Sequence, residues 1–71
     1  MRIEVIKASV PDRDELVVEL WYGDTQVAEV SRGPAGLMVE LYAPFDGGTW
    51  RFELDDFVTS LLEAKRTLSP R

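Results

Sequence analysis

Residues 15–31, ELVVELWYGDTQVAEVS, decide the fold of this chain because they have the pattern of two strands joined by a tight turn. The first half is rich in β-branched and aromatic residues, and the second half resumes an extended pattern after Gly23-Asp24. A glycine at the first turn position permits the positive φ that a two-residue type II′ turn requires. The segment therefore predicts an antiparallel hairpin with strands over 15–22 and 25–31.

Two registers remain open for this hairpin, and they place opposite faces of it in the core. A two-residue loop sets Trp21 opposite Gln26, and it also sets Val17 opposite Val30. A three-residue loop instead aligns alternate apolar residues of the two strands, which are Leu16, Val18, Leu20 and Tyr22 with Ala28 and Val30. In either register, one of the adjacent aromatic residues at 21 and 22 lies off the core face.

Three further segments alternate apolar and polar residues, which is the pattern of short strands with one buried face. They span residues 2–7, 37–42 and 49–54. Between the first of them and the hairpin, Pro11 and two aspartates in ASVPDRD interrupt the pattern and indicate a connection. A Gly-Pro turn in RGPAG precedes the second segment, where the apolar residues are expected to be half-buried.

The last two predicted strands fit each other in one register. If Leu41 lies opposite Trp50, apolar residues face each other on one side, and Glu40 lies opposite Arg51 on the other side as a pair of opposite charges. The connection is then residues 43–48, whose glycine pair supplies the positive φ that a hairpin loop needs. A turn explains these glycines without a ligand, because a phosphate-binding loop would lead into a helix.

The period changes over residues 55–68, DDFVTSLLEAKRTL, where apolar residues recur every three or four positions and predict an amphipathic helix. Asp55 is expected as its N-cap, with Asp56 in the first turn and Lys65 and Arg66 near the other end, all suited to the helix dipole. The predicted fold class is α+β. We expect an antiparallel sheet of about five short strands with one C-terminal helix on one face, in the order β-β-β-β-β-α.

The composition of the chain excludes several classes of function. The 71 residues are enough for one domain, and they include neither cysteine nor histidine, so thiolate chemistry, histidine bases and the usual transition-metal ligands are missing. We therefore expect a non-enzymatic protein without a metal or another cofactor. Thirteen acids against eight bases give a net charge of −5, which disfavours direct nucleic acid binding and favours a basic protein partner. No segment has the pattern of a signal peptide or a membrane span, so a cytoplasmic location without membrane contact is expected.

Aromatic and acidic residues outside the predicted core are the candidate site. Exposed aromatic residues flanked by charge are common anchors of protein interfaces, although scattered apolar residues also occur on any surface. A turn aspartate that binds its own backbone is the simpler alternative for Asp46. The predicted partner-binding residues are Trp21, Glu40, Tyr42, Phe45 and Asp46.

The composition and the candidate residues support three hypotheses about function. The leading one is an interaction domain, of inhibitor, immunity or antitoxin type, that docks its open sheet face or edge on a basic protein or on a second copy of itself. The second is a nucleic-acid mimic, which requires acids aligned on one surface. The third is a carboxylate enzyme with a divalent metal near Glu53 and Asp56, which requires a cleft that the sequence does not predict.

Two segments of the chain resemble a loosely defined group of small bacterial proteins. The group has an E-L-V-x-E-I strand, a turn, a V-A-x-V-S strand and a terminal L-x-x-F-L-x-x-L-x-E-A-K-R-x-L helix. The matching residues here are Glu15, Leu16, Val17, Glu19, Val27, Ala28, Val30, Ser31, Leu54, Phe57, Leu61, Glu63, Ala64, Lys65 and Arg66. The resemblance implies the two-residue hairpin loop and brings no assigned activity.

Overall fold

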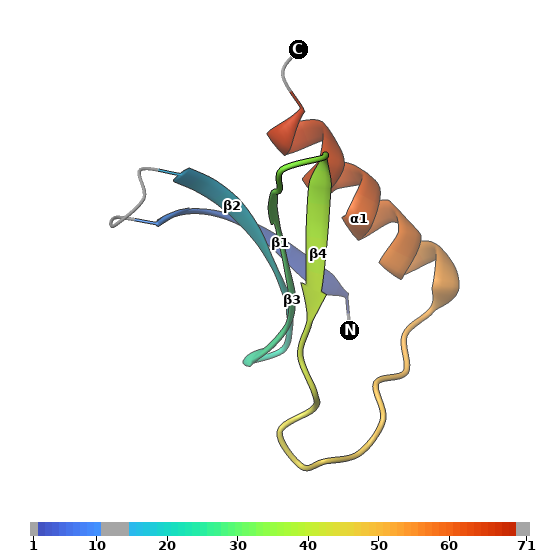
Figure 1. The fold of residues 1–71 in the computed structure, drawn as a ribbon. Helices are drawn as coiled ribbons and strands as arrows, with labels where there is room; N and C mark the ends of the chain where they lie inside the picture. The colour runs from blue at the N-terminus through green and yellow to red at the C-terminus, as the bar shows by residue number, and fades with distance from the viewer. Residues whose placement is uncertain (1, 11–14, 70–71) are drawn as a thin grey trace.

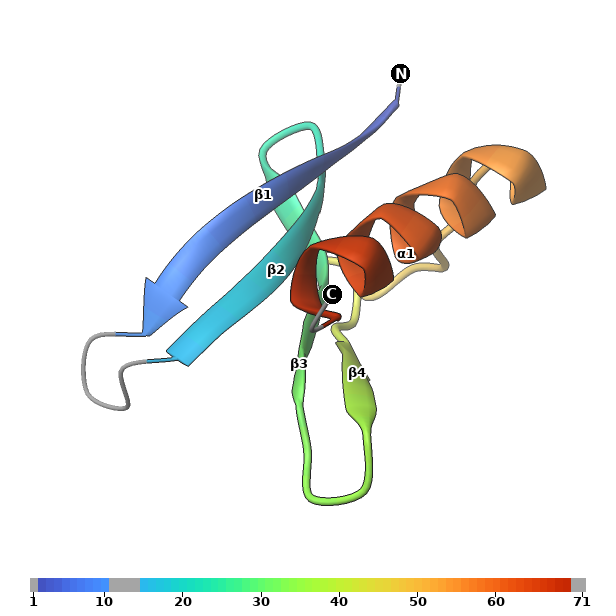
Figure 2. The same cartoon turned by 90° about the horizontal axis from the view of Figure 1, so that it is seen from above.

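The computed structural model describes residues 2–10 and 15–69, which form an antiparallel sheet with one helix packed on it. The elements are β1 (Ile3–Val10), β2 (Glu15–Tyr22), β3 (Thr25–Arg32), β4 (Leu37–Leu41) and α1 (Leu54–Leu68). The strands lie in the order β1-β2-β3-β4, and α1 crosses one face of the sheet (Figures 1 and 2). The α+β class is confirmed, with four strands in the described part of the chain where about five were expected.

The ends of two elements differ from the prediction. β1 continues to Val10, so the start of ASVPDRD belongs to the strand, and the rest of that predicted connection lies outside the described residues. α1 begins at Leu54, which makes Glu53 the N-cap in place of Asp55, and no side chain caps the helix there. The predicted charges are present at both ends, with two aspartates in the first turn and two basic residues in the last.

The β2–β3 hairpin combines features of both predicted registers. Its loop has two residues, Gly23 has a φ of 66°, and Trp21 lies opposite Gln26 as the two-residue loop predicts. Beyond that pair the register shifts, because Val27 is an extra residue that no residue of β2 opposes. Leu20 then lies opposite Ala28, and Val30 lies opposite Val18, so the predicted Val17–Val30 pair is wrong.

The bulge decides which face of the hairpin is buried. The apolar residues of the strands alternate between the two faces except at the bulge, where two consecutive residues are buried. With two helix residues they form the core: Ile3, Val18, Leu20, Val27, Ala28, Val30, Ala64 and Leu68. Phe57 and Leu61 of the predicted helix stripe pack against this core. Tyr22 also packs against this core, whereas Trp21 lies on the opposite face of the sheet. Trp21 is therefore the one of the two aromatic residues that lies off the core face.

The strand expected over residues 49–54 does not form. The ring centroid of Phe52 lies 4.9 Å from that of Tyr22 and 5.7 Å from that of Phe57, and Trp50 stacks on Phe52 at 5.3 Å. Packing these rings under the start of α1 draws the segment away from β4. The predicted strand pairs of residues 41 with 50 and of 40 with 51 are therefore wrong.

Without that strand, β4 forms one edge of the sheet. All five of its residues are exposed, and Leu41 reaches 65% exposure, so the prediction of a half-buried strand is wrong. The helix packs on β1, β2 and β3. Among the described residues, no helix has the length and apolar character needed to cross a membrane.

Candidate functional site: an acidic sheet face

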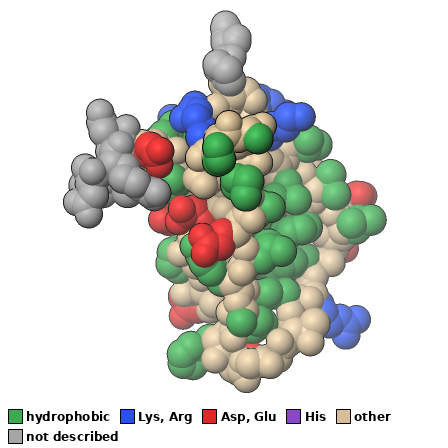
Figure 3. Space-filling model, in the orientation of Figure 1, with side chains coloured by type: hydrophobic (Ala, Val, Ile, Leu, Met, Phe, Trp, Pro, Cys, Tyr) green, Lys and Arg blue, Asp and Glu red, His purple; other side chains and the backbone are tan. Residues whose placement is uncertain are grey.

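The sheet face opposite α1 carries three glutamates in one row across three strands. Glu19 of β2 lies opposite Glu29 of β3, and Glu29 lies opposite Glu40 of β4. Directly opposed residues of antiparallel strands share a face and hold their Cβ atoms about 4.5–5.5 Å apart. Figure 3 shows acidic side chains gathered to the left of β4, on the side away from α1. We call these three residues the glutamate row.

The glutamate row costs the protein stability. Like charges placed directly opposite each other in a sheet destabilise it, by up to about 1 kcal/mol for each pair. Within the described residues, no lysine or arginine forms an ion pair with any of the three carboxylates. No cationic side chain in the described part of the chain therefore offsets the repulsion inside the row, and a cationic ligand on this face would relieve it.

Two aromatic side chains lie beside the glutamate row. The indole Nε1 of Trp21 donates a hydrogen bond of 2.9 Å to Oε1 of Glu19. Partial burial raises the pKa of Tyr42 above its ordinary value, and the negative charges of Glu29, Glu40 and Glu19 raise it further. The structure thus brings three of the five predicted partner-binding residues, Trp21, Glu40 and Tyr42, onto one face.

The other two predicted residues lie in the loop that follows β4. Oδ1 of Asp46 accepts a hydrogen bond of 2.9 Å from the Gly48 amide, and Gly47 has a φ of 77°, so the alternative of a turn aspartate is confirmed. Phe45 is 95% exposed. Both residues line a hollow of about 190 Å³ together with Thr25 and Trp50.

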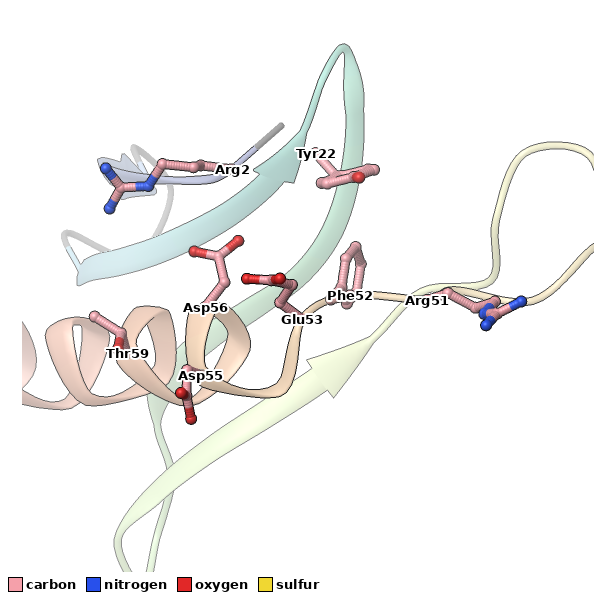
Figure 4. A pocket seen from close by; sticks show the side chains of 8 residues that line it. All are labelled: Arg2, Tyr22, Arg51, Phe52, Glu53, Asp55, Asp56 and Thr59. Atoms are coloured by element: carbon pink, nitrogen blue, oxygen red, sulfur yellow. The ribbon is translucent and has the colours of Figure 1, made fainter.

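A larger cavity of about 670 Å³ opens at the start of α1 (Figure 4). It is lined by Arg2, Tyr22, Arg51, Phe52, Glu53, Asp55, Asp56 and Thr59. The sequence predicted no cleft beside these carboxylates, and that prediction is wrong. It failed because the cavity forms between the N-terminal strand, the end of β2 and the segment before the helix, which are far apart in the chain.

The carboxylates of this cavity do not converge on a common point. Figure 4 shows Asp55 pointing away from Glu53 and Asp56. Oδ2 of Asp56 accepts a hydrogen bond of 3.1 Å from the Ile3 amide, so this side chain ties β1 to α1. No cluster of three acidic, histidine or cysteine side chains in the described part of the chain could hold a metal ion.

The sequence named Glu40 as a candidate but did not align it with Glu19 and Glu29. The alternation in each strand gives two faces, but the register decides which face is buried and which residues of neighbouring strands lie opposite each other. Comparison with protein-family models, curated proteins and solved structures returned no match.

Proposed function

We propose that this protein is a non-enzymatic interaction domain that binds a basic surface of another protein through its acidic sheet face. The observation that carries this proposal is the glutamate row, in which Glu29 is opposed by a glutamate on each side. A sheet gains nothing from such an arrangement in isolation, because the opposed carboxylates repel each other. A lysine or arginine side chain placed between them would turn this repulsion into attraction on both sides.

The aromatic residues beside the row support the same kind of partner. Trp21 is only partly buried and its indole is already oriented by Glu19, so its ring is held next to the carboxylates. Tyr42 lies at the β4 side of the same face. Aromatic rings attract cationic side chains, and tryptophan, tyrosine and arginine are enriched among the residues that contribute most to protein interfaces. The absence of histidine and cysteine from the sequence favours binding over catalysis.

The test is capture of a partner from an extract of the native host, followed by binding measurements with the purified partner. The variant E19Q/E29Q/E40Q removes the row, while E53Q/D55N/E63Q removes three exposed acids at α1, on the other side of the sheet. Both variants change the net charge by the same amount. We expect the row variant to lose at least about tenfold in affinity, equivalent to about 1.4 kcal/mol, and the control to stay close to the wild type.

Salt dependence provides a second readout of the proposal. Attraction between exposed charges weakens as ionic strength rises, so the Kd of the wild type should increase steeply between low and high salt. The row variant should show a much flatter dependence. Equal losses in the two variants would show that net charge alone matters, and the proposal would then be wrong.

A nucleic-acid mimic is the second candidate, and the alignment of the acids is the observation that favours it. The row places three carboxylates in series with no base between them. A partner of this kind would bind nucleic acid at the same surface, so duplex DNA or single-stranded RNA should displace the protein from it. A partner that retains the protein in excess nucleic acid would exclude the mimic and leave the broader proposal intact.

A further inference from the structure

The free edge of β4 has backbone groups that point away from the sheet. The Tyr42 amide donates a hydrogen bond of 2.9 Å to the Val27 carbonyl, and the Gly33 amide donates one of 2.7 Å to the Gly36 carbonyl. Hydrogen-bonded and non-hydrogen-bonded pairs alternate along an antiparallel ladder, and both bonds agree with the β3–β4 register. Met38 and Glu40 therefore direct their backbone groups at β3.

The remaining residues of β4 are Leu37, Val39 and Leu41, and their amide and carbonyl groups face the free edge. Their side chains point to the α1 side of the sheet, yet they are 38%, 48% and 65% exposed. Neither a strand nor a hydrogen bond within the described residues satisfies these backbone groups. β4 thus offers a full set of strand-pairing groups together with an uncovered apolar face.

We infer that β4 pairs antiparallel with β4 of a second copy of this chain, about a two-fold axis that passes beside Val39. This register places Val39 opposite its own counterpart and Leu37 opposite Leu41 of the other copy. Each of these pairs exchanges both of its backbone hydrogen bonds, because these are the residues whose groups point outward. The result is one continuous sheet of two copies with both helices on the same side.

The residue pattern of β4 favours a second copy as the occupant of this edge. On the opposite face, the two-fold axis sets Met38 against Glu40 of the other copy, so no two like charges are directly opposed. Each copy carries a net charge of −5, so two copies can approach only where acids are sparse. Glu40 is the one charged residue of β4, and a basic partner would be drawn instead to the glutamate row.

The surface next to β4 can extend the contact between the copies. Leu54, Val58 and Leu62 recur every four residues along α1, so they lie on one side of the helix, and they are 74%, 43% and 51% exposed. Figure 3 shows hydrophobic side chains gathered between β4 and α1. A contiguous apolar surface of this kind is typical of a protein interface.

The other edge of the sheet is protected from the same association. β1 carries Glu4 and Lys7. Charged residues on an edge strand, lysine in particular, commonly prevent the strand from pairing with another chain. The Ile3 amide is already bound by Asp56. Edge pairing is therefore specific to β4, and it closes the assembly at two copies.

Cysteine cross-linking tests the register directly, because the natural sequence has no cysteine. In the inferred pair the Cα atoms of residue 39 lie about 5.5 Å apart, which suits a disulfide. Val39→Cys should form a disulfide-linked dimer under mild oxidation. Met38→Cys is the matched control, since it is similarly exposed, yet it lies diagonally across from its counterpart at about 7–8 Å, which is too far for a disulfide. We expect Val39→Cys to cross-link at least tenfold faster, and equal rates would overturn the inference.

A charge exchange tests the same pairing without oxidation. L37E/L41E and L37K/L41K each place like charges opposite each other, so each variant alone should have the 8.0 kDa mass of a single chain by light scattering. Their mixture should form a heterodimer of twice that mass. A mixture that stays monomeric would overturn the inference, as would a wild-type chain that is monomeric at about 1 mM protein.

The dimer and the proposed partner site can be tested separately. Added salt should strengthen the dimer, because it screens the repulsion between two acidic chains, whereas it should weaken binding to a basic partner. L37E/L41E should still bind that partner, and E19Q/E29Q/E40Q should still dimerise. If the dimer does not form, the proposed partner site is still tested by its own binding measurement, and the reverse also holds.

Discussion

Replacement of Glu29 by glutamine should stabilise the protein, although it removes a charge from a proposed binding site. Glu29 is opposed by Glu19 on one side and by Glu40 on the other, so a single substitution relieves two repulsive pairs. Each pair costs between about 0.2 and 1 kcal/mol, which predicts a gain of about 1 kcal/mol in the free energy of unfolding. For a domain of this size, 1 kcal/mol raises the Tm by about 4–8 °C.

The assay is thermal or urea unfolding of Glu29→Gln beside the wild type, at low and at high salt. Glu4→Gln is the matched control, because Glu4 lies opposite Trp21 and its replacement removes the same charge without relieving an opposed glutamate. The gain from Glu29→Gln should shrink at about 1 M salt, where the screening length falls to about 3 Å. If Glu29→Gln is no more stable than the control, the row is not a source of strain and the case for a cationic ligand fails.

Three further predictions concern the same face and the helix. Glu29→Gln should lower the pKa of Tyr42, measured as the part of the ultraviolet titration that Tyr42→Phe removes. The pKa of Tyr42 is raised in the folded state, so the contribution of Tyr42 to the free energy of unfolding is complete below about pH 10. This contribution is lost as the pH rises through the pKa of the folded state. Tyr42→Phe should therefore reduce the loss of stability at alkaline pH. Phe52→Ala should cost about 2–3 kcal/mol in urea unfolding, since its ring packs against three others, whereas Phe45→Ala should cost almost nothing. Asp56→Ala should cost about 1–2 kcal/mol and speed hydrogen exchange at the β1 amide that it binds, and unchanged exchange there would contradict the role of this carboxylate.

The sequence by itself determined the fold class and the positions of the hairpin and the helix. These are local properties. The alternation of side chains along a strand, the positive φ of Gly23 and the four-residue spacing along the helix each depend on residues close in the chain. The sequence also required one of Trp21 and Tyr22 to lie off the core face, and the structure places Trp21 there.

Tertiary structure decided everything that depends on how distant segments meet. With an uninterrupted two-residue register, Glu29 would have opposed Val18, and the extra Val27 moves it opposite Glu19 and so creates the row. The segment after β4 had a strand pattern, but the rings of Trp50 and Phe52 gain more contact beside Tyr22 than they would on the edge strand. Because these rings pack beside Tyr22, no strand pairs with the outer edge of β4 in the described part of the chain. Both the acidic face and the free edge thus arise from competition between local pattern and long-range packing, and only the assembled structure resolves that competition.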